Sequence, residues 1–183
     1  MEDYLFTSNR LGFRKWNNED LDVLYELCSD EKVMEHFPSV LSKKECEDFL
    51  QRLQDHYEKN GHSYFAVEVL DTGENIGFIG LALQDYESEF TPAVDVGYRL
   101  KTSAWGKGYA TEGAERCLKH AFEDLNLDRV IATCVEQNIA SEKVMKKIGM
   151  EKKGHFNHPK LKDNPDYRNC IWYELLAQNY NGK

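Results

Sequence analysis

One short segment constrains this chain more than any other, the run Trp105-Gly106-Lys107-Gly108-Tyr109-Ala110-Thr111-Glu112. It follows a strand-like stretch, residues 93–100, and precedes residues whose apolar side chains recur at helical spacing. Two glycines in four residues permit a tight turn between a strand and a helix. A turn of this kind exposes main-chain N–H groups and the positive end of the helix dipole. The segment therefore predicts a binding site for a phosphorylated ligand.

Two familiar phosphate-binding turns do not fit this segment. A Walker A loop requires a glycine where Lys101 stands, and serine or threonine where Gly108 stands. A dinucleotide-binding fingerprint requires a third glycine at the position of Thr111. The plainer interpretation, a glycine-rich turn that only connects a strand to a helix, remains open.

Composition limits the function classes. A chain of 183 residues is expected to form one domain, residues 1–183. Its net charge of −9 disfavours a nucleic-acid partner, and no apolar run is long enough to cross a membrane. The N-terminus lacks the pattern of a signal peptide, so a cytoplasmic protein is expected. The five cysteines are scattered, which favours reduced core thiols over disulfides or metal ligands.

Hydrophobic periodicity predicts a mixture of strands and helices. The expected strands are residues 11–16, 63–70, 75–83, 93–100, 129–135, 150–156 and 170–177. Helices are expected after a cap at Asn18, from the capping box at Ser42 to residue 60, after the glycine turn to residue 125, and over residues 138–148. This order indicates an α+β domain with a central mixed, mostly antiparallel, seven-stranded sheet flanked by about four helices.

The glycine turn resembles the pyrophosphate loop of the GNAT superfamily of N-acetyltransferases, whose pattern is Arg/Gln-x-x-Gly-x-Gly/Ala. Here Trp105 stands in place of the arginine or glutamine. The form Trp-Gly-Lys-Gly-Tyr-Ala-Thr-Glu is similar to the RimJ/RimL-type branch, whose members acetylate protein N-terminal amines and other amines. The departure at Trp105 affects pyrophosphate binding little, because main-chain N–H groups and the helix dipole do most of that binding.

A second segment strengthens the resemblance. Asn138-Ile139-Ala140-Ser141, followed by an apolar helix that ends at Gly149, resembles the family's next segment, Asn-x-x-Ser. Asn138, Ser141 and Met145 share one helix face, and Ala140, Val144 and Ile148 are expected to form the adjacent core-facing row. In element order the resemblance covers residues 8–177, but its specific residues lie between about 93 and 150.

The resemblance implies a GNAT-like domain that uses acetyl-CoA and needs no metal. It assigns the main chain of Tyr98 and Leu100 to the acetyl-CoA, on a splayed strand. The pyrophosphate is assigned to Gly106, Lys107, Gly108, Tyr109, Ala110 and Thr111. Lys107 adds a charge or is simply solvated, and Asn138 contacts the pantetheine arm or merely caps its helix.

The implied reaction is direct attack of a neutral amine on the thioester, without an acyl-enzyme. The leaving thiolate then needs a proton or a hydrogen bond. Many relatives supply it from a tyrosine where this chain has Met145, which cannot donate. Ser141, one turn earlier on the same face, is the candidate here, and its alternative is a hydrogen bond to its own helix.

The attacking amine also needs a base. Asp95 lies on the strand that faces the acetyl group, opposite in phase to Val94, Val96 and Tyr98, and a structural carboxylate is an equal alternative there. Glu87 is a second candidate base, whereas Glu112 fits a role in complementing the helix dipole.

The acceptor itself is left open between a peptide N-terminus and a small-molecule amine. Acceptor-side loops are expected at residues 34–41, 84–91 and 155–169, with Phe37, Tyr86 and Phe156 lining them or packing in the core. A homodimer is compatible with the sequence. The competing function is an idle acetyl-CoA-binding regulatory module, which would lack a working base.

Overall fold

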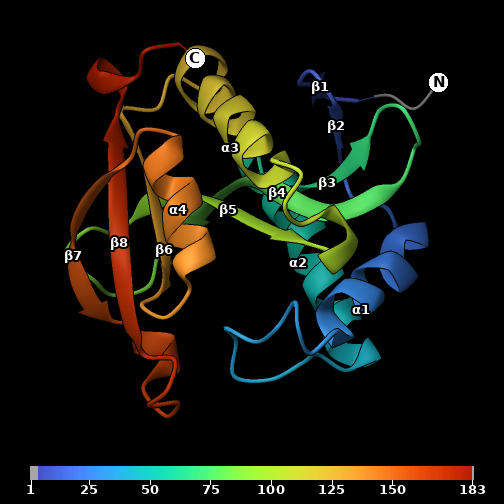
Figure 1. Cartoon of the computed structure of the whole chain (residues 1–183), viewed down its shortest axis with the longest axis horizontal. Helices are drawn as coiled ribbons and strands as arrows, with labels where there is room; N and C mark the ends of the chain where they lie inside the picture. The colour runs from blue at the N-terminus through green and yellow to red at the C-terminus, as the bar shows by residue number, and fades with distance from the viewer. Residues whose placement is uncertain (1–3, 183) are drawn as a thin grey trace.

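The computed structural model describes residues 4–182, and within that range eight strands form one sheet (Figure 1). The strands are β1 (Phe6–Thr7), β2 (Leu11–Arg14), β3 (Tyr64–Val69), β4 (Asn75–Gln84), β5 (Ala93–Leu100), β6 (Arg129–Val135), β7 (Glu151–Asn157) and β8 (Asn169–Leu176). Their order across the sheet is β1-β2-β3-β4-β5-β6-β8-β7, and only the β5–β6 pair is parallel. The predicted mixed, mostly antiparallel sheet is confirmed. It has eight strands rather than seven, because the two-residue β1 is too short to show an alternating pattern.

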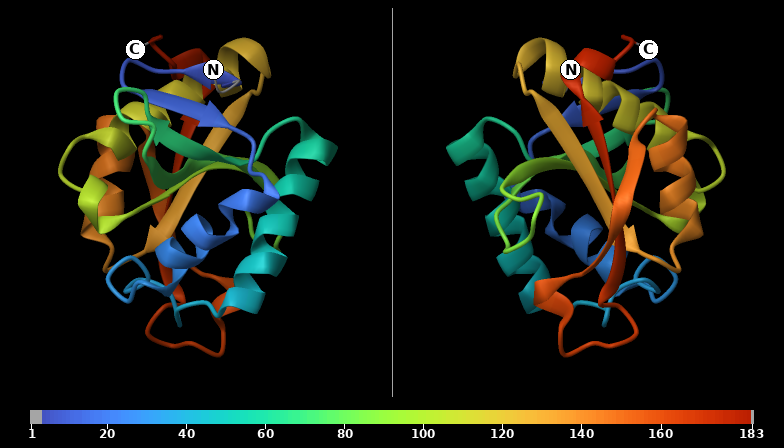
Figure 2. Two further views of the ribbon diagram at one scale, coloured as in Figure 1. Left: turned by 90° about the vertical axis from the view of Figure 1, so that its right-hand side faces the viewer. Right: turned by 90° about the vertical axis from the view of Figure 1, so that its left-hand side faces the viewer.

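The four expected helices are confirmed as α1 (Leu21–Ser29), α2 (Lys43–Asn60), α3 (Tyr109–Lys119) and α4 (Ile139–Lys147). A π-helical turn, His120–Asp124, continues α3. Figure 2 shows α1 and α2 on one face of the sheet and α3 and α4 on the other. None of the helices within residues 4–182 combines the length and the apolar character that crossing a membrane requires.

The helix caps explain where two of these helices begin. The capping box at Ser42 is confirmed, since its hydroxyl accepts the N–H of Glu45 and the Glu45 carboxylate accepts the Ser42 N–H in return. The expected cap at Asn18 is wrong by one residue. Asn17 accepts the N–H of Glu19 and caps a short 3₁₀ turn, Asn18–Asp20, that leads into α1.

Two apolar layers flank the sheet. The larger one lies between the sheet and α3 and α4, and includes Phe13, Phe65, Cys117, Leu118 and Met145. The smaller one lies under α1 and α2. It is made of Trp16, Leu24, Leu27, Cys28, Val33, Met34, Cys46, Leu50, Leu53, Ala66 and Phe78. All five cysteines are free, and all but Cys134 are buried, as expected for core thiols.

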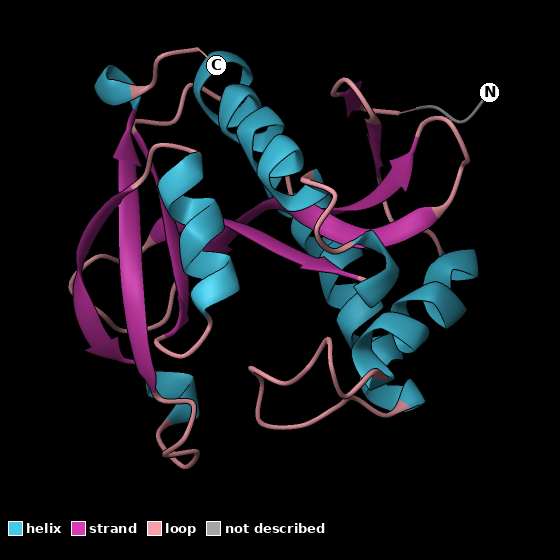
Figure 3. Cartoon of the chain, in the orientation of Figure 1, coloured by secondary structure: helices cyan, strands magenta, loops and turns pink. Residues whose placement is uncertain are grey.

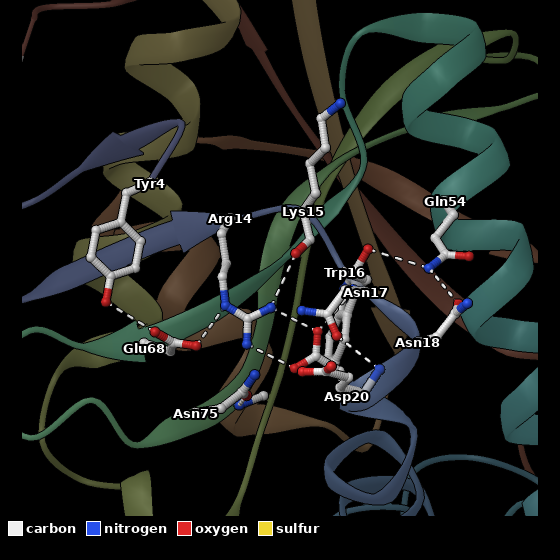
Figure 4. A network of polar contacts seen from close by, with 12 residues as sticks. Tyr4, Arg14, Lys15, Trp16, Asn17, Asn18, Asp20, Gln54, Glu68 and Asn75 are labelled. Atoms are coloured by element: carbon white, nitrogen blue, oxygen red, sulfur yellow. Dashed lines mark hydrogen bonds and ion pairs between the residues drawn. The ribbon is translucent and has the colours of Figure 1, made fainter. Parts of the chain in front are cut away.

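A buried ion network joins β2, β3 and the turn before α1 (Figure 4). The Arg14 guanidinium donates to both carboxylate oxygens of Asp20, at 2.7 and 2.8 Å, and to Glu68 at 2.6 Å. Its hydrogen bonds to Asp20 raise the pKa of Arg14 above its ordinary value. Since both carboxylates are almost fully buried, one cation fixes the entry to α1 against the sheet.

The sheet opens at its centre, between its two parallel strands. Within the described chain, β5 and β6 share a single register pair, Asp95 with Ile131. Beyond that pair β5 continues to Leu100 and β6 to Val135, and the two strands diverge (Figure 1). Figure 3 draws both the long connection from α1 to α2 and the turn between β5 and α3 as loops. This opening places the candidate site.

Candidate active site

The turn between β5 and α3 has a backbone that its two glycines make accessible. Gly106 and Gly108 have φ angles of 75° and 82°, in the left-handed region that other residues rarely adopt. Gly108 is also the N-cap residue of α3, and it has no side chain with which to cap the helix. The chain therefore arrives at α3 with its first N–H groups uncapped.

Six consecutive main-chain N–H groups at this turn have no acceptor within residues 4–182. They belong to Gly106, Lys107, Gly108, Tyr109, Ala110 and Thr111. The main-chain N–H groups on either side of these six are hydrogen-bonded. The Trp105 N–H donates to the Thr102 carbonyl, and the Glu112 N–H donates to the Gly108 carbonyl. Six free donors at the positive end of a helix fit the oxygen atoms of a diphosphate.

Arg10, which no sequence motif marks, braces this turn from the start of β2. Its Nη1 donates to the Lys107 carbonyl at 3.0 Å, and its guanidinium lies 4.6 Å from the centre of the Tyr109 ring. Glu112 accepts from Arg10 and from the Ser8 hydroxyl, and these bonds lower the pKa of Glu112 in spite of its partial burial. Glu112 thus does more than complement the helix dipole: it anchors α3 to the N-terminal strand.

The last part of β5 faces the opening with its main chain. The Lys101 N–H donates to Ile76 on β4, so by the alternation of an antiparallel ladder the main-chain groups of Tyr98 and Leu100 point toward β6. The Leu100 carbonyl is partly occupied, because the Trp105 indole donates to it at 2.8 Å. The two strand residues assigned to acetyl-CoA therefore border the opening between β5 and β6.

Ser141 and Tyr98 meet across this opening. The Tyr98 hydroxyl donates to the Ser141 carbonyl at 2.9 Å and lies 3.0 Å from the Ser141 hydroxyl. Burial raises the pKa of Tyr98 above its ordinary value. Met145 on α4 has no hydroxyl, and the tyrosine hydroxyl that lies beside Ser141 comes from β5 instead.

Asn138, the first residue of the Asn-x-x-Ser segment, caps the N-terminus of α4. The Asn138 side-chain oxygen accepts the Ser141 N–H at 3.0 Å, which leaves the amide nitrogen without an acceptor in the described range. Met145 is buried in the larger core. The expected core-facing row is wrong at Ala140, which is exposed, because Met145 and Ile148 provide the buried contacts of α4.

Asp95 lies on the opposite face of β5 from Tyr98, toward α1 and α2. Both of its oxygens accept the Tyr64 hydroxyl, at 2.8 and 2.9 Å, and Gln84 donates to that hydroxyl at 3.2 Å. Burial raises the pKa of Asp95 to about 6. The structure does not bring Asp95 into contact with Ser141; the two flank the opening from opposite faces of the sheet. Glu87 is exposed.

The expected acceptor-side aromatics divide between the surface and a small core. Phe37 is 38% exposed on the connection between α1 and α2. Tyr86 and Phe156 instead pack with Phe90 in an apolar cluster. Within residues 4–182 no three histidine, cysteine, aspartate or glutamate side chains gather as metal ligands would.

The chain is similar in sequence to known proteins. The family described as Acetyltransferase (GNAT) domain matches residues 10–151. The chain is 33% identical to the uncharacterized N-acetyltransferase YnaD of Bacillus subtilis, over 96% of this chain and 98% of that protein.

Solved structures show the same fold. A GNAT-family acetyltransferase from Bacillus anthracis superposes with a TM-score of 0.78 at 28% identity, covering 94% of this chain and 98% of its own. RimL, a ribosomal L7/L12 alpha-N-protein acetyltransferase solved in complex with coenzyme A, superposes with a TM-score of 0.79 at 18% identity, covering 97% and 99% of the two chains.

Proposed function

This chain belongs to the GNAT family of acetyltransferases, and we propose that it transfers the acetyl group of acetyl-CoA to a primary amine on a peptide N-terminus or a small molecule. The observation that carries the proposal is the row of six unpaired N–H groups at residues 106–111. In this assignment they bind the diphosphate of acetyl-CoA, and the main chain of Tyr98 and Leu100 guides the pantetheine arm into the opening. The free amide nitrogen of Asn138 contacts the same arm.

The transfer proceeds by direct attack. The lone pair of a neutral amine forms a bond to the thioester carbonyl carbon, and the resulting tetrahedral intermediate collapses as the carbon–sulfur bond breaks. Asp95, directly or through a water molecule, takes the proton that the amine nitrogen must lose. Its pKa of about 6 supports this role, because a carboxylate near neutrality is both ionised and basic enough to accept a proton.

The departing thiolate receives a proton or a hydrogen bond from Ser141. The Tyr98 hydroxyl supports this role, since it holds Ser141 by two contacts of 2.9 and 3.0 Å. Asp95 on one face of β5 and Ser141 on α4, beside Tyr98 on the other face, suit the reaction, because the base acts on the amine nitrogen and Ser141 acts on the departing sulfur. A base at Asp95 is what would distinguish an enzyme from an idle acetyl-CoA-binding module.

We propose that the chain belongs to the RimJ/RimL-type branch. The support is the turn Trp-Gly-Lys-Gly-Tyr-Ala-Thr-Glu at residues 105–112, together with a fold that RimL shares. Membership of this branch favours terminal α-amines and small amines as acceptors.

Two measurements test the proposed function. Calorimetric titration with acetyl-CoA is expected to show heat of binding, and acetyl-CoA is expected to raise the melting temperature of the protein. A thiol-release assay against peptides, amino acids, polyamines and aminoglycosides is then expected to show acetyl-CoA-dependent turnover with at least one class. Absence of both binding and turnover at millimolar acetyl-CoA would overturn the proposal, whereas binding without turnover would favour the regulatory module.

A further inference from the structure

Arg99 places a positive charge on the face of β5 that is turned toward α1 and α2. It shares that face with Asp95, since the two are four residues apart on one strand. Its guanidinium lies 4.1 Å from the centre of the Phe37 ring, 5.3 Å from Phe78 and 6.0 Å from Phe49. The faces of these aromatic rings attract the positive charge. They provide no oxygen or nitrogen atom to accept the N–H groups, which lie in the plane of the guanidinium.

No carboxylate within residues 4–182 pairs with this guanidinium. Its one hydrogen bond runs from Nη1 to the Cys28 sulfur at 3.2 Å, and its Nε is buried without an acceptor. Arg14 provides the contrast, because that half-buried guanidinium is held by Asp20 and Glu68. The Nε–Nη2 edge of Arg99, which is the edge that grips a carboxylate with two parallel hydrogen bonds, is thus left without a partner.

The position of Arg99 relates this unpaired edge to the reaction. Asp95, Gly97 and Arg99 succeed one another along one face of β5, and the Tyr64 ring covers Gly97, where an added Cβ would lie 2.7 Å from the ring. Arg99 lies beyond the single β5–β6 register pair, where the strands have diverged. Asp95 and Arg99 therefore lie on the same face of β5, toward α1 and α2, with the Tyr64 ring between them, and Arg99 lies on the part of β5 that borders the opening.

We propose that Arg99 binds a carboxylate of the acceptor, so that the acceptor is a low-molecular-weight amine that also bears a carboxylate, as an amino acid does. This inference rests on the proposed function and narrows its acceptor class. A polyamine brings only positive charge to this guanidinium and is disfavoured. Phe37, on the exposed connection between α1 and α2, packs against the apolar part of the same acceptor.

Matched sets of three acceptors test the proposal. Each amino acid is compared with its carboxamide and with the amine that lacks the carboxyl group, in the thiol-release assay at saturating acetyl-CoA. The wild type is expected to favour the carboxylate over the amide by about tenfold or more in kcat/KM, the effect of one charge-assisted bidentate contact. Arg99→Gln is expected to remove that preference by lowering kcat/KM for each amino acid to about the value for its carboxamide.

Two variants and one binding measurement control the test. Arg99→Lys keeps the positive charge but lacks the two parallel N–H donors of a guanidinium. It is expected to retain part of the preference for the carboxylate over the amide. Arg52→Gln removes an exposed guanidinium that lies 5.5 Å from the Phe49 ring, and is expected to change nothing. Calorimetry of the CoA-saturated protein with N-acetyl amino acids and their amides reports the same discrimination without turnover.

The outcomes separate the two levels of inference. Equal kcat/KM for acids and amides, a preference for spermidine, or an Arg99-dependent preference for acidic peptides over free amino acids would each overturn the assignment of Arg99 while leaving an N-acetyltransferase in place. Equal affinity for N-acetyl amino acids and their amides would also overturn it. Absence of acetyl-CoA binding in the wild type would instead remove the proposed function itself.

Discussion

Arg10 and Glu112 stand 102 residues apart in the chain and are joined by two hydrogen bonds of 2.7 Å, one from the Arg10 side-chain Nε and one from its main-chain N–H. The same guanidinium donates to the Lys107 carbonyl. The pair therefore ties the glycine turn and the first turn of α3 to the start of β2. A turn held in this way presents its free N–H groups in one geometry before any ligand arrives.

The first prediction concerns this brace. Arg10→Gln is expected to raise the KM for acetyl-CoA by about tenfold, through the loss of a charge-assisted contact, and to change the KM for the amine little. Steady-state kinetics with each substrate varied separately measures both effects. Lys15→Gln, which breaks the exposed ion pair of Lys15 with Glu58, is the control and is expected to behave as wild type. An unchanged KM for acetyl-CoA in Arg10→Gln would refute the brace.

The second prediction compares two glycines with the same backbone and different positions. Gly106 and Gly61 have φ angles of 75° and 74°, and no atom lies within 4 Å of an added Cβ at either. Alanine at each position is expected to cost about 1–2 kcal/mol of unfolding free energy, because a left-handed residue with a Cβ is strained. Only Gly106→Ala is expected to weaken acetyl-CoA binding as well. Calorimetry measures the affinity of both variants for acetyl-CoA, and urea unfolding measures their stability. Equal acetyl-CoA affinities of Gly106→Ala and Gly61→Ala would count against a main-chain diphosphate site.

The third prediction is a pH dependence. Because burial raises the pKa of Asp95 to about 6, the carboxylate is protonated and inactive as a base below that value, and kcat/KM is expected to rise with pH through about 6. Asp95→Asn is expected to lower kcat/KM by about 10²-fold and to abolish its rise with pH through about 6. Glu87→Gln, at an exposed position, serves as the control. A pH profile that keeps its step in Asp95→Asn but loses it in Glu87→Gln would transfer the role to Glu87.

The fourth prediction concerns the leaving group. Ser141→Ala is expected to lower kcat by about 10²-fold with the KM for acetyl-CoA nearly unchanged, because the proton or hydrogen bond is needed only as the thiolate departs. Tyr98→Phe retains the ring and removes the hydroxyl that contacts Ser141, so a smaller loss of kcat is expected. Full turnover by Ser141→Ala would show that the departing thiolate does not depend on Ser141.

The fifth prediction concerns stability away from the site. Arg14→Gln is expected to lower the unfolding free energy by about 3–5 kcal/mol, because two buried carboxylates lose their cation. Lys43→Gln breaks an exposed ion pair with Asp22 and is expected to leave the unfolding midpoint unchanged. Chemical denaturation of both variants provides the measurement, and similar midpoints would contradict the assigned weight of the Arg14 network.

The sequence was most informative where structure depends on neighbours along the chain. The helix after the glycine turn, the capping box at Ser42 and the hairpin of β3 and β4 were all predictable, because each is set by spacing or by a local hydrogen bond. The two-residue β1 was missed, since nothing within Phe6–Thr7 itself shows that it pairs with β2. The cap before α1 was misplaced by one residue because Asn17 and Asn18 are equally suitable side chains.

By itself the sequence determined the order of the elements and the turn whose six N–H groups remain free, because glycine spacing and helical periodicity act over a few residues. Only the tertiary structure decided which distant side chains meet. The contact of Tyr98 with Ser141, the brace between Arg10 and Glu112, and the unpaired charge of Arg99 among aromatic rings each join separate strands, helices or loops. Such contacts depend on how the sheet twists and opens, and that geometry results from the packing of the whole core rather than from any one segment.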